Sequence, residues 1–63
     1  MSAIRQRVVQ ERSELAARRG KLKAFLGTAP FFALPDAQQR LLEAQCAVME
    51  QYLTILDQRL VLI

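Results

Sequence analysis

Apolar residues recur along the C-terminal half of the chain at alternating spacings of four and three residues. This first seam consists of Leu42, Cys46, Met49, Leu53, Leu56, Leu60 and Ile63. The spacing places all of its members on one stripe of an α-helix, and it is typical of helices that pack together along their length. The pattern therefore predicts an all-α fold in which this helix has at least one long partner.

A second seam begins one residue earlier and has the same spacing. It consists of Leu41, Gln45, Val48, Tyr52, Ile55, Arg59 and Leu62. Two adjacent seams make an apolar face that is wider than one partner helix can cover. We expect one seam to bury against another helix of the same chain and the other to bury against another chain.

Glycine and proline occur only between Gly20 and Pro35, and they divide the chain into two helical stretches. We predict a helix over about residues 2–26, a connection over 27–35 and a helix over about 36–62. Residues 1–63 then form a single domain, a two-helix antiparallel hairpin that assembles into an oligomeric helical bundle. Gly20 lies inside the first helix, where it either permits a close approach or is simply tolerated.

Residues with known capping preferences stand at the predicted helix ends. Ser2 is placed to cap the first helix, and Gly27 to end it in the left-handed conformation. Asp36 and Gln39 have the spacing of a capping box at the start of the second helix.

The connection between the helices is unusually apolar for a loop. Pro30 predicts one short helical turn over residues 31–34. Phe31, Phe32 and Leu34 are predicted to plug the end of the hairpin, and contact with a ligand is the alternative role for them.

Chain length and composition favour self-association and argue against catalysis. The sequence has 63 residues, of which 52% are hydrophobic, and a chain of this size buries a core of marginal stability. It contains one cysteine, Cys46, and no histidine, so an intrachain disulfide, a histidine–metal site and a Ser-His-Asp triad are excluded. We therefore expect oligomerisation, no catalytic residues, no metal and no cofactor, with Cys46 as a small core residue.

Charge is distributed unevenly between the two halves. Residues 1–35 contain seven Lys or Arg and two Glu, a net charge of +5, whereas residues 36–63 contain two Arg and four acidic residues, a net charge of −2. A basic stripe of Arg5, Arg12 and Arg19 is expected to border a ligand pocket or to contact the acidic helix of a neighbour. The basic and acidic helices attract each other within or between chains, or the basic half attracts nucleic acid.

Acidic residues of the second helix form a stripe of their own. It consists of Glu43, Glu50 and Asp57, spaced seven residues apart. This spacing predicts solvated surface positions on one outward side of the helix. An acid/base pair for catalysis is the less favoured interpretation.

The first helix has one main seam, and polar residues interrupt it. The seam consists of Ile4, Val8, Glu11, Leu15, Arg18, Leu22 and Phe25. In an antiparallel hairpin, the polar interruptions Glu11 and Arg18 approach the interruptions of the second helix, which are Gln45, Tyr52 and Arg59. Two interpretations stay open: a structural network in which Glu11 pairs with Arg59, or a polar pocket at a subunit interface.

In the pocket interpretation, each of these five residues has a chemical role. The guanidinium groups of Arg18 and Arg59 are suited to phosphate oxygens. Tyr52 can stack on a base, Gln45 can bind the edge of that base, and Glu11 can orient an arginine. These five residues are the predicted ligand-binding site.

The sequence also bears on the compartment of the protein. Its start lacks the apolar core of a signal peptide, and no stretch approaches the length of a membrane span. The unpaired Cys46 fits a reducing environment. We expect a cytoplasmic protein that does not insert into membranes.

An ordered set of short motifs resembles a known family. The motifs are Arg7–Arg12, Glu14-Leu15, Lys21–Leu26, Phe32–Pro35, Leu41-Leu42, Gln45, Met49, Tyr52, Ile55-Leu56 and Arg59-Leu60. Together they cover nearly the whole chain and are similar to a family of very small phage proteins named after crAss-like phages. The family is also found in other tailed phages and in prophages.

The resemblance implies a function in phage counter-defence. Helical hairpins of this kind resemble those of phage anti-CBASS and anti-Thoeris sponges, which form oligomers and sequester cyclic-nucleotide or ADP-ribose-derived alarm signals. It implies that this chain binds such a signal in the cytoplasm of an infected or lysogenic bacterial host without cleaving it. Two alternatives stay open, a Rop-like RNA-binding or DNA-binding four-helix bundle, and a protein-interaction module that inhibits a host factor.

Overall fold

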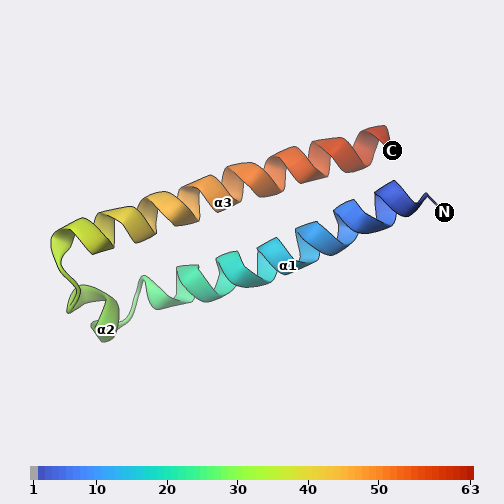
Figure 1. The fold of residues 1–63 in the computed structure, drawn as a ribbon. Coiled ribbons are helices and arrows are strands. Elements are labelled where there is room, and N and C mark those ends of the chain that lie inside the picture. The colour runs from blue at the N-terminus through green and yellow to red at the C-terminus, as the bar shows by residue number, and fades with distance from the viewer. Residues whose placement is uncertain (1) are drawn as a thin grey trace.

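The structure is a computed structural model that describes residues 2–63, and it contains two long antiparallel helices joined by a short one (Figure 1). Helix α1 covers Ala3–Phe25, α2 covers Ala29–Phe32 and α3 covers Asp36–Leu62. The start of α1 and the end of α3 lie at the same end of the hairpin, and α2 lies at the other end. The all-α hairpin is confirmed, and the short helix α2 lies two residues earlier than the turn predicted over residues 31–34. Met1, the first residue of the predicted domain, lies outside the described residues.

The first seam of α3 faces α1. Leu56 is fully buried and packs with Val8 and Leu15 of α1 in the central core cluster. Met49, Leu53 and Leu60 pack against this cluster. Cys46 is also buried, as predicted, and has a free thiol. This arrangement answers the question that the sequence left open, because it is the first seam that faces the other helix of the chain.

The second seam of α3 remains exposed. Its large apolar members Leu41, Val48, Tyr52, Ile55 and Leu62 all contact solvent in the single chain. The main seam of α1 is covered unevenly, since Val8 and Leu15 are buried whereas Ile4 and Arg18 are exposed. One chain therefore buries one seam of α3 and leaves the other uncovered.

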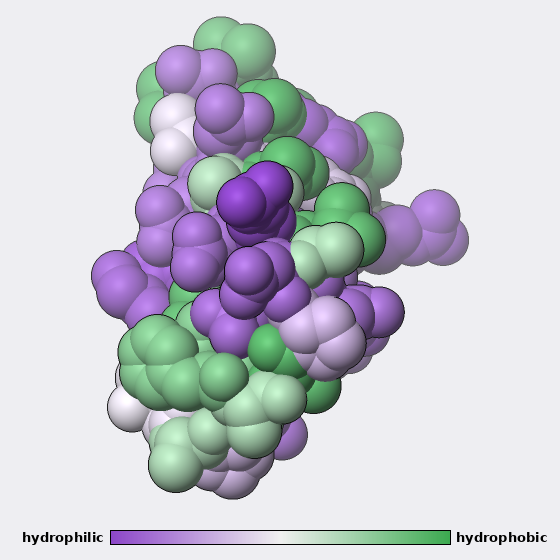
Figure 2. Space-filling view, turned by 90° about the vertical axis from the view of Figure 1, so that its left-hand side faces the viewer, coloured by the Kyte–Doolittle hydropathy of each residue, from purple (hydrophilic) through white to green (hydrophobic). Residues whose placement is uncertain are grey.

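The turn end is closed by aromatic packing. Phe31 of α2 is 2% exposed, and its ring meets that of Phe25 edge to face at a centroid distance of 5.9 Å. Phe32 is 64% exposed, so the prediction that it plugs the hairpin is wrong, although its ring contacts Phe31 at 5.2 Å. Figure 2 views the molecule from this end and shows hydrophobic side chains gathered at its lower part, over α2. Consecutive residues of a short helix point in different directions, so α2 can bury only one of its two phenylalanines.

Ser2 and Thr28 cap helices, whereas the caps predicted at Gly27 and Asp36 are absent. Ser2 caps α1 through the backbone N–H of Arg5, at 3.3 Å, as predicted. Gly27 does not adopt the left-handed conformation, because no glycine of the described residues has positive φ, and Leu26, the C-cap of α1, lies in the right-handed region. Thr28 links the helices instead: its hydroxyl donates to the Phe25 carbonyl at 2.7 Å and accepts from the Phe31 N–H.

The predicted capping box at the start of α3 is also absent. Pro35 is the N-cap of α3, no side chain caps the helix, and Asp36 is already its first residue. Gln39 turns back toward the connection and donates to the carbonyls of Phe32, at 3.2 Å, and Leu34, at 2.8 Å. Gln39, predicted as the N3 member of the capping box, therefore binds carbonyls at and after the end of α2 instead.

Candidate functional site

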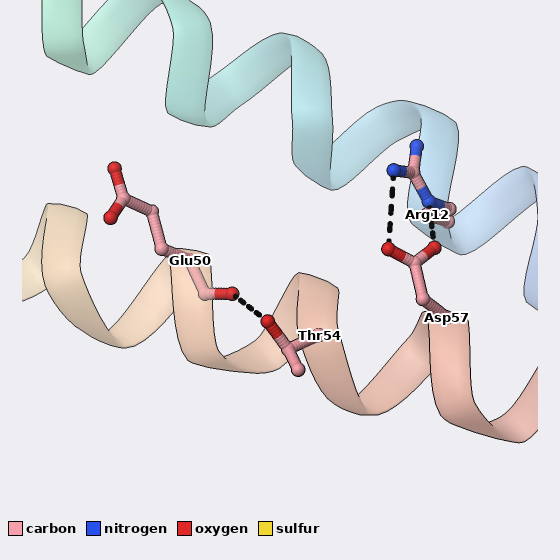
Figure 3. A network of polar contacts seen from close by, with 4 residues as sticks. All are labelled: Arg12, Glu50, Thr54 and Asp57. Carbon is pink, nitrogen blue, oxygen red and sulfur yellow. Dashed lines mark hydrogen bonds and ion pairs between the residues drawn. The ribbon is translucent and has the colours of Figure 1, made fainter.

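One long side of the hairpin is closed by ion pairs. We call it the ion-paired face, and it consists of Arg12, Arg19 and Lys23 of α1 with Glu50 and Asp57 of α3. Figure 3 shows the side chain of Arg12 directed at Asp57, with dashed lines from two of its nitrogens to both carboxylate oxygens. The longer of these two bonds joins Nη2 to Oδ2 at 3.4 Å. The basic and acidic helices therefore attract each other within one chain.

Glu50 is the second acidic residue of the ion-paired face. Its Oε1 atom lies 3.6 Å from Arg19 Nε, 3.8 Å from Lys23 Nζ and 4.0 Å from the thiol of Cys46. At 3.6 Å, Arg19 Nε and Glu50 Oε1 form an ion pair but no hydrogen bond, so the buried Nε atom has no hydrogen-bond partner. Glu50 and Asp57 are exposed to solvent, as predicted, and each also pairs with the basic stripe of α1 within the same chain.

The pKa values of Arg12 and Asp57 follow from their contact. The hydrogen bond from Arg12, aided by its positive charge, lowers the pKa of the Asp57 carboxyl. The same hydrogen bond and the negative charge of Asp57 raise the pKa of Arg12. Both side chains are exposed to water, so the pair does more to fix helix register than to add stability.

Arg5, the first member of the basic stripe, has a different role. Its Nη1 atom donates to the backbone carbonyls of Leu60, at 2.8 Å, and Ile63, at 3.0 Å. The last carbonyls of a helix have no partner within it, and cationic side chains are favourable at this end. Arg5 therefore caps α3 from the other helix. Its position one heptad before Arg12 was the only sequence signal for this contact.

The five predicted ligand-binding residues lie away from the ion-paired face. On α1, Glu11 and Arg18 each precede by one position a residue that pairs with α3. On α3, Gln45, Tyr52 and Arg59 each precede a residue of the first seam, whereas Glu50 and Asp57 follow such residues. Successive residues of a helix lie about 100° apart around its axis. On α3, the residues before and after a buried position therefore lie on opposite flanks. On α1, Glu11 and Arg18 likewise lie one step around the helix from the residues that pair with α3. In an antiparallel hairpin, the two flanks that carry the ion pairs face one side, and the two opposite flanks face the other side. The five predicted residues therefore share the side opposite the ion pairs.

We call this side the open face. From α1 it comprises Arg7, Glu11, Glu14, Arg18 and Lys21, and from α3 it comprises the whole second seam. Glu11 is half-buried, and the other four predicted site residues are exposed. No ion pair joins Glu11 to Arg18 or to Arg59 within residues 2–63, so the predicted Glu11–Arg59 pair is not formed in the single chain. The structure therefore collects the five residues on one face without binding them to each other.

The hollows on the surface do not enclose the predicted site. One, of about 390 Å³, is lined by Ala3, Gln6, Arg7, Gln10, Glu11 and Glu14. A second is lined by Arg5, Gln6, Val9 and Gln10. Both lie along the first turns of α1, and neither is lined by Arg18, Gln45, Tyr52 or Arg59. Of the five predicted site residues, only Glu11 lines one of these two hollows.

Two further features limit the chemistry of the described residues. Within residues 2–63, no three His, Cys, Asp or Glu side chains are grouped so that they could hold a metal ion. In the same part of the chain, no helix has the length and apolar character needed to cross a bilayer.

Comparison with known proteins identifies a family for this chain. The family model described as Sequestin matches residues 2–62, which is nearly the whole chain. No curated protein and no solved structure matches the chain.

Proposed function

Because the chain belongs to the Sequestin family, we propose that it is a sequestering protein, which binds a small ligand and holds it without cleaving it. The family match over residues 2–62 is the observation that carries this proposal. A binding role also fits the open face, where guanidinium, phenol and amide groups are free to contact a ligand.

The ligand in this proposal is a cyclic nucleotide or a cyclic ADP-ribose-type immune signal. Such a molecule combines phosphate groups with a flat base. Arg18 and Arg59 are exposed on the open face and can fork onto phosphate oxygens. Tyr52 is 41% exposed, which leaves part of its ring available to stack on a base. Gln45 supplies both a donor and an acceptor for the base edge.

The biological role in this proposal is phage counter-defence, carried out by a homo-oligomer in the cytoplasm of the bacterial host. It rests on the resemblance of the sequence motifs to small phage proteins and to phage anti-CBASS and anti-Thoeris sponges. Oligomerisation is supported by the exposed second seam and by the extended shape of the chain, 47 × 14 × 12 Å. An oligomer would also cover a ligand that one open face leaves in contact with water.

The nucleic-acid alternative has less support from the charges. A helix that tracks phosphates needs free cationic side chains along its length. Arg12, Arg19 and Lys23 already pair with α3, and Arg5 binds its last carbonyls. The basic stripe is thus largely used within the chain.

Isothermal titration calorimetry tests the proposal. The purified protein would be titrated with a panel of cyclic dinucleotides, cyclic trinucleotides and cyclic ADP-ribose isomers, and with a structured RNA hairpin at two salt concentrations. We expect saturable binding to at least one small ligand, and recovery of that ligand intact after the protein is denatured. No binding across the panel, or recovery of a cleaved product, would refute sequestration, and strongly salt-dependent RNA binding alone would support the alternative.

A pair of variants tests the site. Arg59→Ala should weaken ligand binding at least about tenfold, the effect of losing about 1.4 kcal/mol of binding free energy. Arg40→Ala is the matched control, because Arg40 is an exposed arginine of the same helix that lies outside the open face. Equal affinities for the two variants would remove Arg59 from the site.

A further inference from the structure

The second seam of α3 is an exposed apolar stripe along the whole open face. Leu41, Val48, Ile55 and Leu62 are 65%, 61%, 53% and 84% exposed. The chain exposes 4799 Å² in total, whereas a compact protein of its mass exposes about 4,100 Å². The excess of roughly 700 Å² is close to the area of about 800 Å² that each partner loses in a stable interface. A second chain of similar size on the open face would therefore account for the uncovered surface.

The order of residues along the second seam is nearly symmetric about Tyr52. Val48 and Ile55 lie four residues before and three residues after Tyr52, and Gln45 and Arg59 lie seven residues to either side. Leu41 and Leu62 end the seam, eleven residues before and ten residues after. A stripe with this order is complementary to an antiparallel copy of itself, since apolar residues then face apolar residues and Gln45 faces Arg59. Such self-complementarity is what a two-fold interface requires.

The charges of α1 provide an independent check on a two-fold axis through Tyr52. The Arg12–Asp57 and Arg19–Glu50 pairs place Tyr52 level with the stretch of α1 between Arg12 and Arg19. Because residue numbers run in opposite directions along the two helices, Tyr52 lies level with about position 17 of α1, and a two-fold axis through Tyr52 crosses α1 within about 1.5 Å, the rise of one residue, of position 16.

Charges of opposite sign then face each other across the axis. Glu14 and Arg18 lie two residues to either side of position 16, and Glu11 and Lys21 lie five residues to either side. Pairing α1 with an antiparallel copy about this axis places Glu14 opposite the partner's Arg18 and Glu11 opposite the partner's Lys21. Each contact occurs twice by symmetry. Glu14 already accepts a hydrogen bond from Gln10 at 2.9 Å, and a carboxylate can accept several.

From these two patterns we infer that the open face binds a second copy of this chain about a two-fold axis through Tyr52, with α3 antiparallel to the partner's α3 and α1 antiparallel to the partner's α1. The inference builds on the proposed function, because it places Gln45 opposite the partner's Arg59 and brings the two Tyr52 side chains together. The predicted ligand site is then composite and lies on the axis, with residues from both protomers.

A different two-fold axis, parallel to the helices, would also stack two open faces. It would set α3 against the partner's α1. The apolar residues Val48 and Ile55 would then face the charged stretch of the partner's α1, which has no large apolar side chain between Leu15 and Leu22. Charged groups lose hydration against an apolar stripe without gaining a partner. The chemistry of the face therefore favours the axis through Tyr52.

Disulfide formation at the axis tests this arrangement directly. A residue on a two-fold axis meets its own copy, and a disulfide needs Cα atoms about 5.5–6 Å apart. Tyr52→Cys would be introduced together with Cys46→Ala, so that each chain has one thiol. Thr54→Cys in the same background is the matched control, because Thr54 is exposed on α3 outside the second seam. We expect a covalent dimer for Tyr52→Cys under mild oxidation and at least about tenfold less for Thr54→Cys; equal yields would overturn the arrangement.

A charge exchange provides a second test that does not depend on cysteine. Arg18→Glu sets two glutamates against each other across the axis, and Glu14→Lys sets lysine against arginine, so each variant alone should dimerise more weakly than the natural chain. Mixed in equal amounts, they should form a heterodimer with both ion pairs restored, which sedimentation velocity would detect. A mixture no more associated than the separate variants would overturn the α1 pairing.

These tests are separate from the test of sequestration. Light scattering on the unmodified protein without ligand should give twice the chain mass, and a monomer would overturn the two-fold inference whatever the calorimetry shows. A dimer with the expected cross-link that binds no member of the ligand panel would leave the two-fold arrangement standing and remove the proposed function.

Discussion

Arg12 of α1 and Asp57 of α3 form a two-point ion pair across the hairpin, with Nε donating to Oδ1 and Nη2 donating to Oδ2 at 3.4 Å. Seven residues later on α1 and seven residues earlier on α3, Arg19 forms a looser ion pair with Glu50, with Nε and Oε1 3.6 Å apart. The two pairs fix the rotation of α1 relative to α3, because each requires the basic flank of α1 to lie beside the acidic flank of α3. The opposite flanks, which hold all five predicted ligand-binding residues, are thereby left on the uncovered side.

The Arg12–Asp57 pair predicts a specific acid dependence. Since the pKa of Asp57 is lowered in the folded chain, Asp57 binds protons less readily there than in the unfolded chain. Its stabilising contribution is complete above the ordinary carboxyl pKa of about 3.9 and is lost as the pH falls below that value toward the lowered one. Urea denaturation at several pH values between about 5 and 2 should show a smaller loss of stability for Asp57→Asn than for the natural chain. Glu43→Gln, on the same acidic stripe but in no ion pair within residues 2–63, should behave as the natural chain does.

Leu56 should be the most sensitive core position. It is 0% exposed and lies in the centre of the cluster with Val8 and Leu15. Leu56→Ala removes apolar contacts and leaves a cavity, which should lower the free energy of unfolding by about 2–5 kcal/mol. Val61→Ala, at a position 85% exposed in the single chain, should change it by less than about 0.5 kcal/mol. Chemical denaturation followed by circular dichroism would compare them, and similar losses would place the core elsewhere.

Arg5 should hold down the end of α3. Its guanidinium binds the carbonyls of Leu60 and Ile63. Arg5→Ala should therefore increase amide hydrogen exchange in the last turns of α3, with little change around Cys46. Arg7→Ala removes an arginine from the same helix that makes no contact with these carbonyls, and it serves as the control. Unchanged exchange near Leu60 in Arg5→Ala would show that the cap adds no order to this end.

The two adjacent phenylalanines of α2 should differ sharply in their effect on stability. Phe31 is buried and packs against Phe25, whereas Phe32 is mostly exposed. Phe31→Ala should cost about 3–5 kcal/mol, and Phe32→Ala should cost much less. Thermal or chemical unfolding of the two variants measures the difference. A reversed order would mean that Phe32, not Phe31, closes the turn end.

Gly20 is a site where a larger residue should stabilise the protein. It lies within α1, and a Cβ atom built there meets nothing within 4 Å. Gly20→Ala should raise the free energy of unfolding by about 1 kcal/mol, because alanine has the higher helix propensity. Ala17→Gly, the reverse change at an exposed position of the same helix, should lower it by a similar amount. A loss of stability in Gly20→Ala would indicate that another chain packs closely at Gly20.

Short-range signals were less reliable guides than periodicity. The spacing of Leu42, Cys46 and Met49 predicted the long second helix, and the glycine and proline positions predicted where the chain turns. The left-handed Gly27 and the Asp36 capping box were wrong, because Thr28 and Gln39 make the hydrogen bonds that organise the connection. Capping residues are interchangeable over a few positions, and only the three-dimensional path of the turn selects among them.

The sequence by itself determined that this chain forms two long helices, that they fold back on each other and that α3 has more apolar surface than α1 can cover. These properties depend on residue type and spacing, which act along a single helix. Which seam faces α1, and whether the basic stripe meets its own chain or a neighbour, was decided only by the tertiary structure. Both depend on how α1 is rotated about its axis relative to α3, and that rotation is set by the packing of Val8, Leu15 and Leu56 together with the Arg12–Asp57 pair.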